Sequence, residues 1–133
     1  MVKRIENTGL DEFTGKVSKI DLEEKEINGE MREQYHIHIE PKDVEVKGET
    51  GHMHEWVQLS PKTQQTEVPQ GSVVDRYLQQ IEICISEAKT AETLNTAFDL
   101  MVGKTFKFKK IKLGRDYDGN KAREVITPVA LVE

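Results

Sequence analysis

The sequence predicts a mainly β domain with five strands and a two-helix insert between the third and fourth strands. Five segments alternate apolar and polar residues, as strands with one buried face do. Asn-Gly and Asp-Gly dipeptides, which favour hairpin turns, each separate two of these segments. The chain has 133 residues, enough for one domain whose core needs no disulfide. We expect a flexible N-terminal arm over residues 1–12 and a single domain over residues 13–133.

The first three strands are expected in the N-terminal half of the chain. The first begins near Phe13, and its apolar residues change parity at Ser18–Lys19, which indicates a β-bulge. The Asn-Gly dipeptide at residues 28–29 predicts a tight hairpin turn. The second strand is expected over residues 32–40 and the third over residues 52–60, because apolar residues alternate in both.

The helical insert follows residues 60–71, which contain two prolines and are expected to form a surface loop. Ser72 is expected to cap the first helix together with Asp75. Thr90 is expected to cap the second helix, and Gly103 to end it. Both helices have an apolar face at the spacing of an amphipathic helix, so both should pack on the sheet.

The last two strands are expected to form a hairpin around the Asp-Gly dipeptide at residues 118–119. The fourth strand covers residues 106–113, and a change of parity predicts a second bulge near Lys109–Lys110. The fifth strand covers residues 124–132, where Pro128 indicates an edge position or a bulge.

Charge is unevenly distributed along the chain. The 19 Lys/Arg and 24 Asp/Glu give a net charge of −5, yet residues 104–123 hold eight Lys/Arg against two Asp. That segment carries +6, which leaves −11 for the other 113 residues. The asymmetry predicts one positive surface on an acidic body, and it argues against a very basic protein that coats DNA.

Several classes of protein lack their signatures in this sequence. A single cysteine excludes a disulfide framework and a cysteine-based zinc site. There is no apolar run of about 18 residues and no signal peptide, so we expect a cytoplasmic protein that does not contact a membrane. Phosphate-binding loops, dinucleotide fingerprints and nucleophile motifs are also missing, so we expect no enzymatic activity and no cofactor.

The expected element order and the junction LMVGKTFKFKKIK at residues 100–112 resemble OB-fold domains of single-stranded DNA-binding proteins of the replication protein A type. The resemblance covers about residues 13–132 and implies a five-stranded OB-type Greek-key barrel, here with two helices where a minimal domain has one. It also implies non-enzymatic binding of single-stranded nucleic acid, with DNA favoured over RNA. In OB folds the ligand crosses the second and third strands and contacts the loops between strands 1–2 and 4–5.

Three kinds of residue are candidates for this contact. Lysines and arginines near the last hairpin would contact phosphates, exposed rings would stack on bases, and the histidines of the second strand would line the same groove. The candidates are Trp56, Tyr117, His36, His38, Lys107, Lys109, Lys110, Lys112, Arg115, Lys121 and Arg123. Lysines also keep edge strands soluble without binding a ligand. Large rings are usually covered, so the alternative for Trp56 is cover by the 60–71 loop or by the N-terminal arm.

All four histidines occur in two i, i+2 pairs, His36/His38 and His52/His54. Each pair projects from one face of a strand, and imidazole nitrogens can bind zinc. If residues 47–51 form a tight turn, the two pairs lie about 20 Å apart along the sheet. If residues 41–51 form a loop, the pairs can meet. The Val44/Val46 alternation favours the tight turn, and we therefore expect no metal site.

A second hypothesis is a protein-interaction or assembly module with an OB-like barrel and no nucleic-acid binding. Its contact surfaces would be the helical insert and the acidic face of residues 20–50, which hold ten Asp/Glu against four Lys/Arg. A stable oligomer that does not bind nucleic acid would favour this hypothesis.

Overall fold

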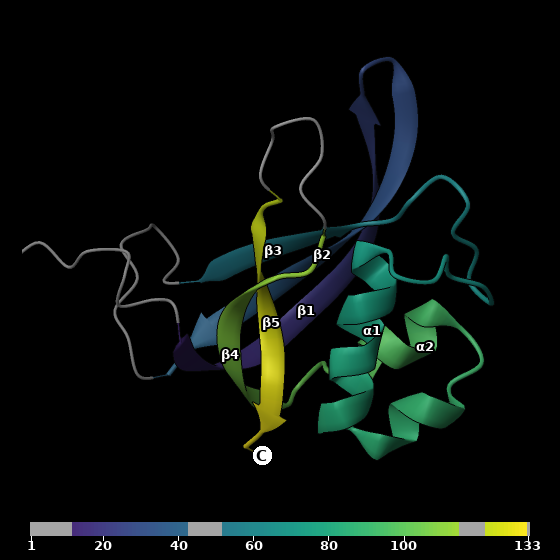
Figure 1. The fold of residues 1–133 in the computed structure, drawn as a ribbon. Helices are drawn as coiled ribbons and strands as arrows, with labels where there is room; N and C mark the ends of the chain where they lie inside the picture. Colours follow the sequence, from purple (N-terminus) through teal and green to yellow (C-terminus); the bar gives the residue numbers. More distant parts are fainter. Residues whose placement is uncertain (1–11, 43–51, 115–121, 133) are drawn as a thin grey trace, which may run out of the picture.

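The computed structural model describes residues 12–42, 52–114 and 122–132, which form a mainly β domain with a helical insert, as predicted (Figure 1). The insert lies between the third and fourth strands. The elements in chain order are β1 (Glu12–Ile27), β2 (Glu30–Pro41), β3 (Met53–Gln58), α1 (Val73–Cys84), the short 3-10 helix η2 (Ser86–Thr90), α2 (Leu94–Asp99), β4 (Thr105–Lys112) and β5 (Glu124–Leu131).

All five strands pair in one antiparallel sheet with the order β3-β2-β1-β4-β5. The central strand β1 pairs on both sides near its start, where Gly15 lies opposite Pro41 of β2 and Phe106 of β4. The register with β2 shifts between Val17 and Lys19, which confirms the first predicted bulge. A bulge bends and twists a strand, and here it lets β1 leave β4 and continue beside β2 alone.

A second irregularity lies in the β4–β5 pair, at a different place from the prediction. The extra residue is Val129 of β5, between the paired residues Pro128 and Ala130. Proline has no N–H to donate, so the ladder is interrupted beside it. This confirms the interpretation of Pro128. The bulge predicted near Lys109–Lys110 is wrong, because the register with β5 is continuous there.

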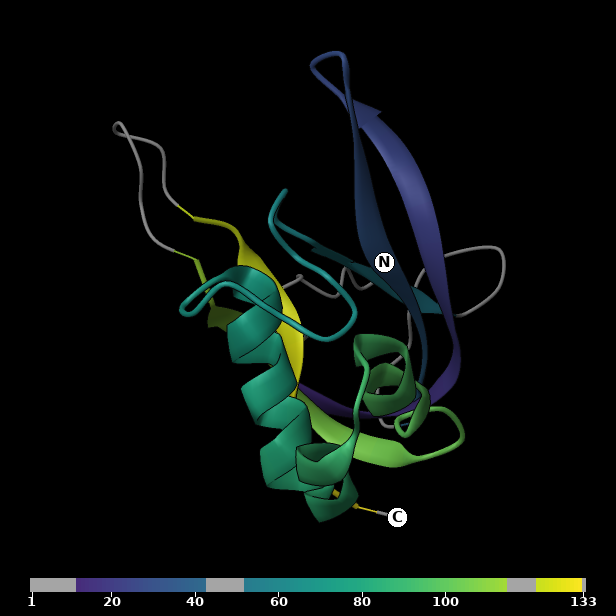
Figure 2. The ribbon, with the colours of Figure 1, turned by 90° about the vertical axis from the view of Figure 1, so that its right-hand side faces the viewer.

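The β1–β2 hairpin is the longest element pair of the fold. It turns at Asn28 and Gly29, whose φ angles of 52° and 82° are those a type I′ turn requires, so the predicted turn is confirmed. The β2–β3 ladder reaches Gln34 and Gln58, and beyond this pair β1 and β2 continue as a two-stranded ribbon. The tip of the ribbon projects away from the rest of the molecule (Figures 1 and 2).

The helix caps agree with the prediction for α1 and differ for α2. The Ser72 hydroxyl accepts the Asp75 N–H at 3.2 Å, as predicted. The cap of α2 is Thr93, whose hydroxyl accepts an N–H of the first turn. Thr90, the predicted cap, instead ends η2 and donates its hydroxyl to the Glu87 carbonyl at 3.0 Å. The unpredicted 3-10 turn therefore moves the start of α2 by three residues.

The helices cover the inner side of the curved sheet, where α1 packs on β5 and β3 and α2 contacts β1 (Figure 2). Tyr77 of α1 is fully buried and donates its hydroxyl to the Ile126 carbonyl at 3.2 Å. Tyr35 of β2 stacks on Phe98 of α2, with ring centroids 4.0 Å apart. Because the core lies on this side, the opposite face of β2 and β3 remains open to solvent.

The two edge strands, β3 and β5, are joined by side chains. Glu55 of β3 is only 3% exposed, and its carboxylate accepts the Ile126 N–H of β5 at 2.8 Å. The Arg123 guanidinium donates to the same carboxylate at 2.6 Å and to the Trp56 carbonyl at 2.9 Å. Among the described residues no backbone ladder joins these edges, so the sheet is curved and bridged rather than closed by strand pairing.

Candidate functional site

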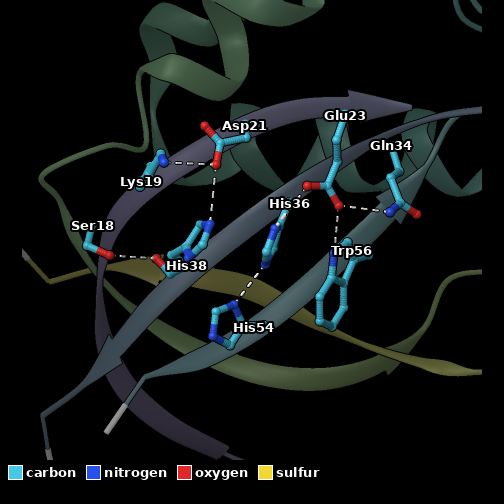
Figure 3. A network of polar contacts seen from close by, with 9 residues as sticks. All are labelled: Ser18, Lys19, Asp21, Glu23, Gln34, His36, His38, His54 and Trp56. Atoms are coloured by element: carbon cyan, nitrogen blue, oxygen red, sulfur yellow. Dashed lines mark hydrogen bonds and ion pairs between the residues drawn. The ribbon is translucent and has the colours of Figure 1, made fainter. Parts of the chain in front are cut away.

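The open face of β2 and β3 carries a cluster of aromatic rings. Strand alternation turns His36 and His38 of β2 and His54 and Trp56 of β3 to this face, because their neighbours are buried. In the β2–β3 register His36 lies opposite Trp56, and His38 lies opposite His54. The four rings therefore lie side by side (Figure 3).

This register overturns the expected separation of the histidine pairs. The ladder pairs Ile39 with Met53 and Tyr35 with Val57, which keeps four apolar side chains on the buried face. A strand register is fixed by such a match of buried faces. With a tight turn at residues 47–51, the residues opposite His52 and His54 would be Val46 and Val44. That expected register is wrong, because His54 lies opposite His38. Residues 43–51 themselves lie outside the described part of the chain.

The three histidines of the face, His36, His38 and His54, lie within contact distance of one another; we call them the histidine cluster. His36 Nε2 lies 2.8 Å from His54 Nδ1. The rings of His36 and His38 stack with centroids 4.0 Å apart, and His38 meets His54 edge-on at 4.8 Å. One ring nitrogen from each histidine lies within 4.8 Å of the others.

Two carboxylates of β1 border the rings. Glu23 accepts hydrogen bonds from the Gln34 amide at 3.0 Å, the Trp56 indole N–H at 3.0 Å and His36 Nδ1 at 3.2 Å (Figure 3). Asp21 lies 3.4 Å from His38 Nε2, which is an ion-pair distance. The alignment of that pair does not make a hydrogen bond, so within the described structure the buried His38 Nε2 has no hydrogen-bond partner.

These contacts shift the ionisation of the site. Partial burial acts to raise the pKa of Glu23, but the hydrogen bonds from Gln34, His36 and Trp56 outweigh it and the pKa falls. Burial lowers the pKa of both His38 and His54, and the neighbouring histidines lower it further. At neutral pH the site therefore holds an ionised Glu23 beside neutral His38 and His54 rings.

Trp56 is partly covered, though by other groups than we expected. Its ring stacks on His36 at 4.6 Å, and its indole N–H is held by Glu23. The side chain is still 39% exposed. The stacking and hydrogen-bond partners of the ring are His36, His54 and Glu23, none of which belongs to the 60–71 loop, and the N-terminal arm lies outside the described residues.

A cleft of about 660 Å³ adjoins the exposed part of Trp56. It lies between the β1–β2 hairpin, β3, the start of α1 and the residues that flank the β4–β5 turn. Its polar and charged lining residues are Lys25, Arg32, Gln34, Gln58, Ser60, Ser72 and Arg123. Three of these are cations, and no acidic residue is among the described residues that line the cleft.

The cations of the cleft are arranged in a way that favours an anion. Lys25 and Arg32 lie directly opposite each other in the β1–β2 ladder, and like charges in such a pair repel. Arg32 forms an ion pair with Glu30 at 3.4 Å, while its buried Nε has no hydrogen-bond partner in the described structure. Arg123 is anchored by Glu55, yet its side chain is 60% exposed.

The predicted contact residues other than Trp56 divide into four groups. Arg123 lines the cleft. Lys107, Lys109, Lys110 and Lys112 lie on β4, and none of them lines it; Lys107 forms an ion pair with Glu12 at 2.5 Å. Arg115, Tyr117 and Lys121 fall outside the described residues. His36 and His38 lie beside Trp56 on the same face but do not line the cleft.

The sequence reasoning missed Lys25, Arg32, Glu23 and Glu55. The Asn-Gly turn could have located the first two, because a two-residue turn at residues 28–29 places position 25 opposite position 32. Glu55 has the same parity as Val57, which was expected to point inward. A carboxylate at an inward position is a signal of a buried ion pair, because charges are rarely buried alone.

Comparison of the chain with models of protein families, with curated proteins and with solved structures gave no match. In the described part of the chain, no helix is long and apolar enough to span a membrane.

Proposed function

We propose that the protein binds single-stranded nucleic acid, with DNA as the first candidate, in the cleft beside Trp56. The observation that carries the proposal is an exposed tryptophan ring at the border of a cleft whose described lining holds three cations and no acid. This combination suits a ligand that is both anionic and aromatic, on a chain whose net charge is −5.

Each part of the ligand has a matching group. The exposed part of the Trp56 ring offers a surface for a base, and stacking contributes about 1–3 kcal/mol per base. The side chains of Lys25, Arg32 and Arg123 would form ionic contacts with the phosphates. The glutamines and serines of the lining can donate hydrogen bonds to sugars and bases. A volume of about 660 Å³ lies within the range of small-ligand sites, roughly 300–1,000 Å³.

The cleft favours a single strand over a duplex. In a duplex the bases are paired and stacked on one another, so a ring on the protein cannot reach their faces. In a single strand each base can leave its neighbours and stack on Trp56. Phosphate contacts with a few cations hold the strand in a salt-dependent way.

The arrangement of the strands supports an OB-type fold for this site. β1 pairs with both β2 and β4, and the helices lie between β3 and β4 in the chain. We infer that Glu55 completes an OB-type barrel by linking β3 to β5 through its side chain. On such a barrel the ligand crosses the β2–β3 face, where Trp56 lies.

The test is a titration of a fluorescently labelled single strand of about 20 nucleotides, at low and at physiological salt, with a duplex as a control. The wild-type protein is expected to bind the single strand more tightly than the duplex and to lose affinity with salt. Trp56→Ala should weaken binding about 5- to 150-fold at both salts, the equivalent of one stacked base. Arg32→Gln should reduce the salt slope.

Ile83→Ala is the matched control, because Ile83 is a large apolar side chain, 68% exposed, on α1 and outside the described cleft lining. It should bind like the wild type. Equal affinity of the wild type and Trp56→Ala would remove Trp56 from the site. No binding at low salt would end the proposal and favour the protein-interaction module.

A further inference from the structure

Three imidazoles lie together on the open face of β2 and β3, outside the hydrophobic core. His54 is exposed, and His36 and His38 are half-buried, so the histidine cluster is accessible from solvent. A cluster of rings that can each carry a positive charge is unfavourable unless something compensates it. We propose that His36, His38 and His54 bind a divalent transition-metal ion of the zinc, copper or nickel class.

The distances suit such an ion. Imidazole nitrogens lie at about 2.0–2.1 Å from zinc, so ligands around a tetrahedral ion are about 3.3–3.4 Å apart. One nitrogen from each ring lies within 4.8 Å of the others, and His36 Nε2 lies 2.8 Å from His54 Nδ1. Small rotations of the exposed His54 side chain can bring the set to ligand spacing without moving the strands.

Glu23 prepares His36 as a ligand. Its carboxylate accepts the N–H of His36 Nδ1 at 3.2 Å, which leaves the lone pair of Nε2 directed at His54. Metal-binding histidines usually donate their second ring nitrogen to a carboxylate in this way. In this tautomer His54 Nδ1 carries the hydrogen that is donated to His36 Nε2. On metal binding, His54 would change tautomer, its hydrogen moving from Nδ1 to its own Nε2, so that both facing nitrogens could bind the ion.

The surroundings of His38 point in the same direction. His38 Nε2 is buried, and its nearest polar contact given for the described residues is the Asp21 carboxylate at 3.4 Å, which is not a well-aligned hydrogen bond. Asp21 and Glu23 place two carboxylates beside the cluster, and Lys19, 3.3 Å from Asp21, offsets one of the two negative charges. The set of three nitrogens selects borderline metals over magnesium and calcium, which prefer oxygen ligands.

The experiment uses the full chain without a polyhistidine tag, freed of metal with a chelator, and titrates it with zinc chloride by calorimetry. One zinc ion per chain is expected to bind. A parallel titration with copper or nickel chloride follows the emission of Trp56, the single tryptophan of the chain. Quenching is expected because the Trp56 ring stacks on His36 and His54 at 4.6 and 5.8 Å.

The zinc affinities of single-histidine variants test which residues bind the ion. His54→Ala, which changes an exposed side chain, should lower zinc affinity by at least about tenfold, and His36→Ala should do the same. His52→Ala is the control, since His52 is the chain's remaining histidine and lies outside the cluster; it should bind like the wild type. Circular dichroism checks that each variant is folded.

Two results would overturn the proposal. One is a wild-type protein that binds no zinc in the calorimeter. The other is His54→Ala and His36→Ala proteins, both folded, that bind zinc as tightly as the wild type. Neither result depends on nucleic acid, so the proposal stands or fails separately from the function proposed above.

Discussion

At the scale of single residues, Glu23 connects the histidine cluster to the cleft. One oxygen of its carboxylate accepts from Gln34 and Trp56, and the other accepts from His36. The same side chain therefore fixes the tautomer of His36, with the hydrogen on Nδ1, and the orientation of the Trp56 ring. Glu23 is a positioning residue in both proposals.

Glu23→Gln should weaken zinc binding by about 10- to 100-fold, because the amide cannot replace the carboxylate behind His36. It should also change the emission of Trp56 in the metal-free protein, since the indole N–H loses a charged acceptor. Calorimetry and fluorescence measure the two effects. Glu24→Gln, which changes the exposed neighbour, is the control. Unchanged zinc affinity in Glu23→Gln would show that the carboxylate does not support the ligand.

Loss of the Glu55 side chain should destabilise the protein. Its carboxylate accepts from the N–H groups of Ile126 and Trp56 and from Arg123. Glu55→Ala leaves the buried Ile126 donor unpaired, and we expect a loss of about 2–3 kcal/mol in the free energy of unfolding. Urea denaturation measures it. Glu124→Ala, an exposed site on β5, should change stability by less than about 0.5 kcal/mol. Similar values for both variants would contradict the bridge.

For the histidines, local sequence predicts the strand face of each pair but not whether the two pairs meet. Their alternation correctly placed each pair on one strand face. Whether the pairs meet depends on the β2–β3 register, and that register follows from the buried partners Ile39 and Met53 on two strands. Both a tight turn and a longer loop were compatible with residues 41–51. The local turn signal favours one register and the match of buried faces favours another, and the structure has the second.

At the scale of elements, β1 packs closely against both of its neighbouring strands near its start. Gly15 lies where β1 is flanked by both β2 and β4. A Cβ at this position would lie 2.7 Å from Ile39 Cγ2 and 3.3 Å from the Glu40 carbonyl oxygen. The strand is therefore packed so closely that only glycine fits without a shift of its neighbours.

Gly15→Ala should destabilise the protein by about 1–3 kcal/mol, the range for overpacked cores. Thermal unfolding followed by circular dichroism measures the change. The control is Gly114→Ala, where the added carbon would meet Val73 Cγ2 at 3.4 Å and Ala122 at 3.5 Å. That variant should be nearly neutral. A neutral Gly15→Ala would mean that the strand can relax at this point.

The cap of α1 gives an independent test of an element that the sequence predicted correctly. Ser72→Ala removes the acceptor of the Asp75 N–H and should cost about 1 kcal/mol. Ser86→Ala, at the exposed start of η2 where no side-chain cap is formed, should have little effect. Equal costs in chemical denaturation would contradict the role of the cap.

The difference between the two caps explains what was predictable. Ser72 begins its helix directly after a loop, so the local pattern was sufficient. Thr90 and Thr93 are both capping residues three positions apart, and the choice between them depends on η2. Ala88 of η2 is buried in the core, which is a tertiary contact that no local pattern shows.

At the scale of the whole molecule, the positive surface lies in part where the charge run did not predict it. The lysines of β4 do not line the described cleft, whereas Lys25 and Arg32 of the β1–β2 hairpin come together there with Arg123, about 90 residues further along the chain. A charge count along the sequence finds runs, and it cannot find cations that a fold assembles. The number of strands, the helical insert and the hairpin turn were predictable, since each depends on local pattern.

The most direct test of the central proposal is an NMR titration of isotopically labelled protein with a single strand of about 12 nucleotides, a length that one OB-type domain can cover. The account predicts that the Trp56 indole N–H and the amides of Arg32 and Arg123 shift with increasing oligonucleotide, while the exposed turns of α1 do not. Shifts confined to the helices or to β4, or no shifts at low salt, would contradict binding in the cleft.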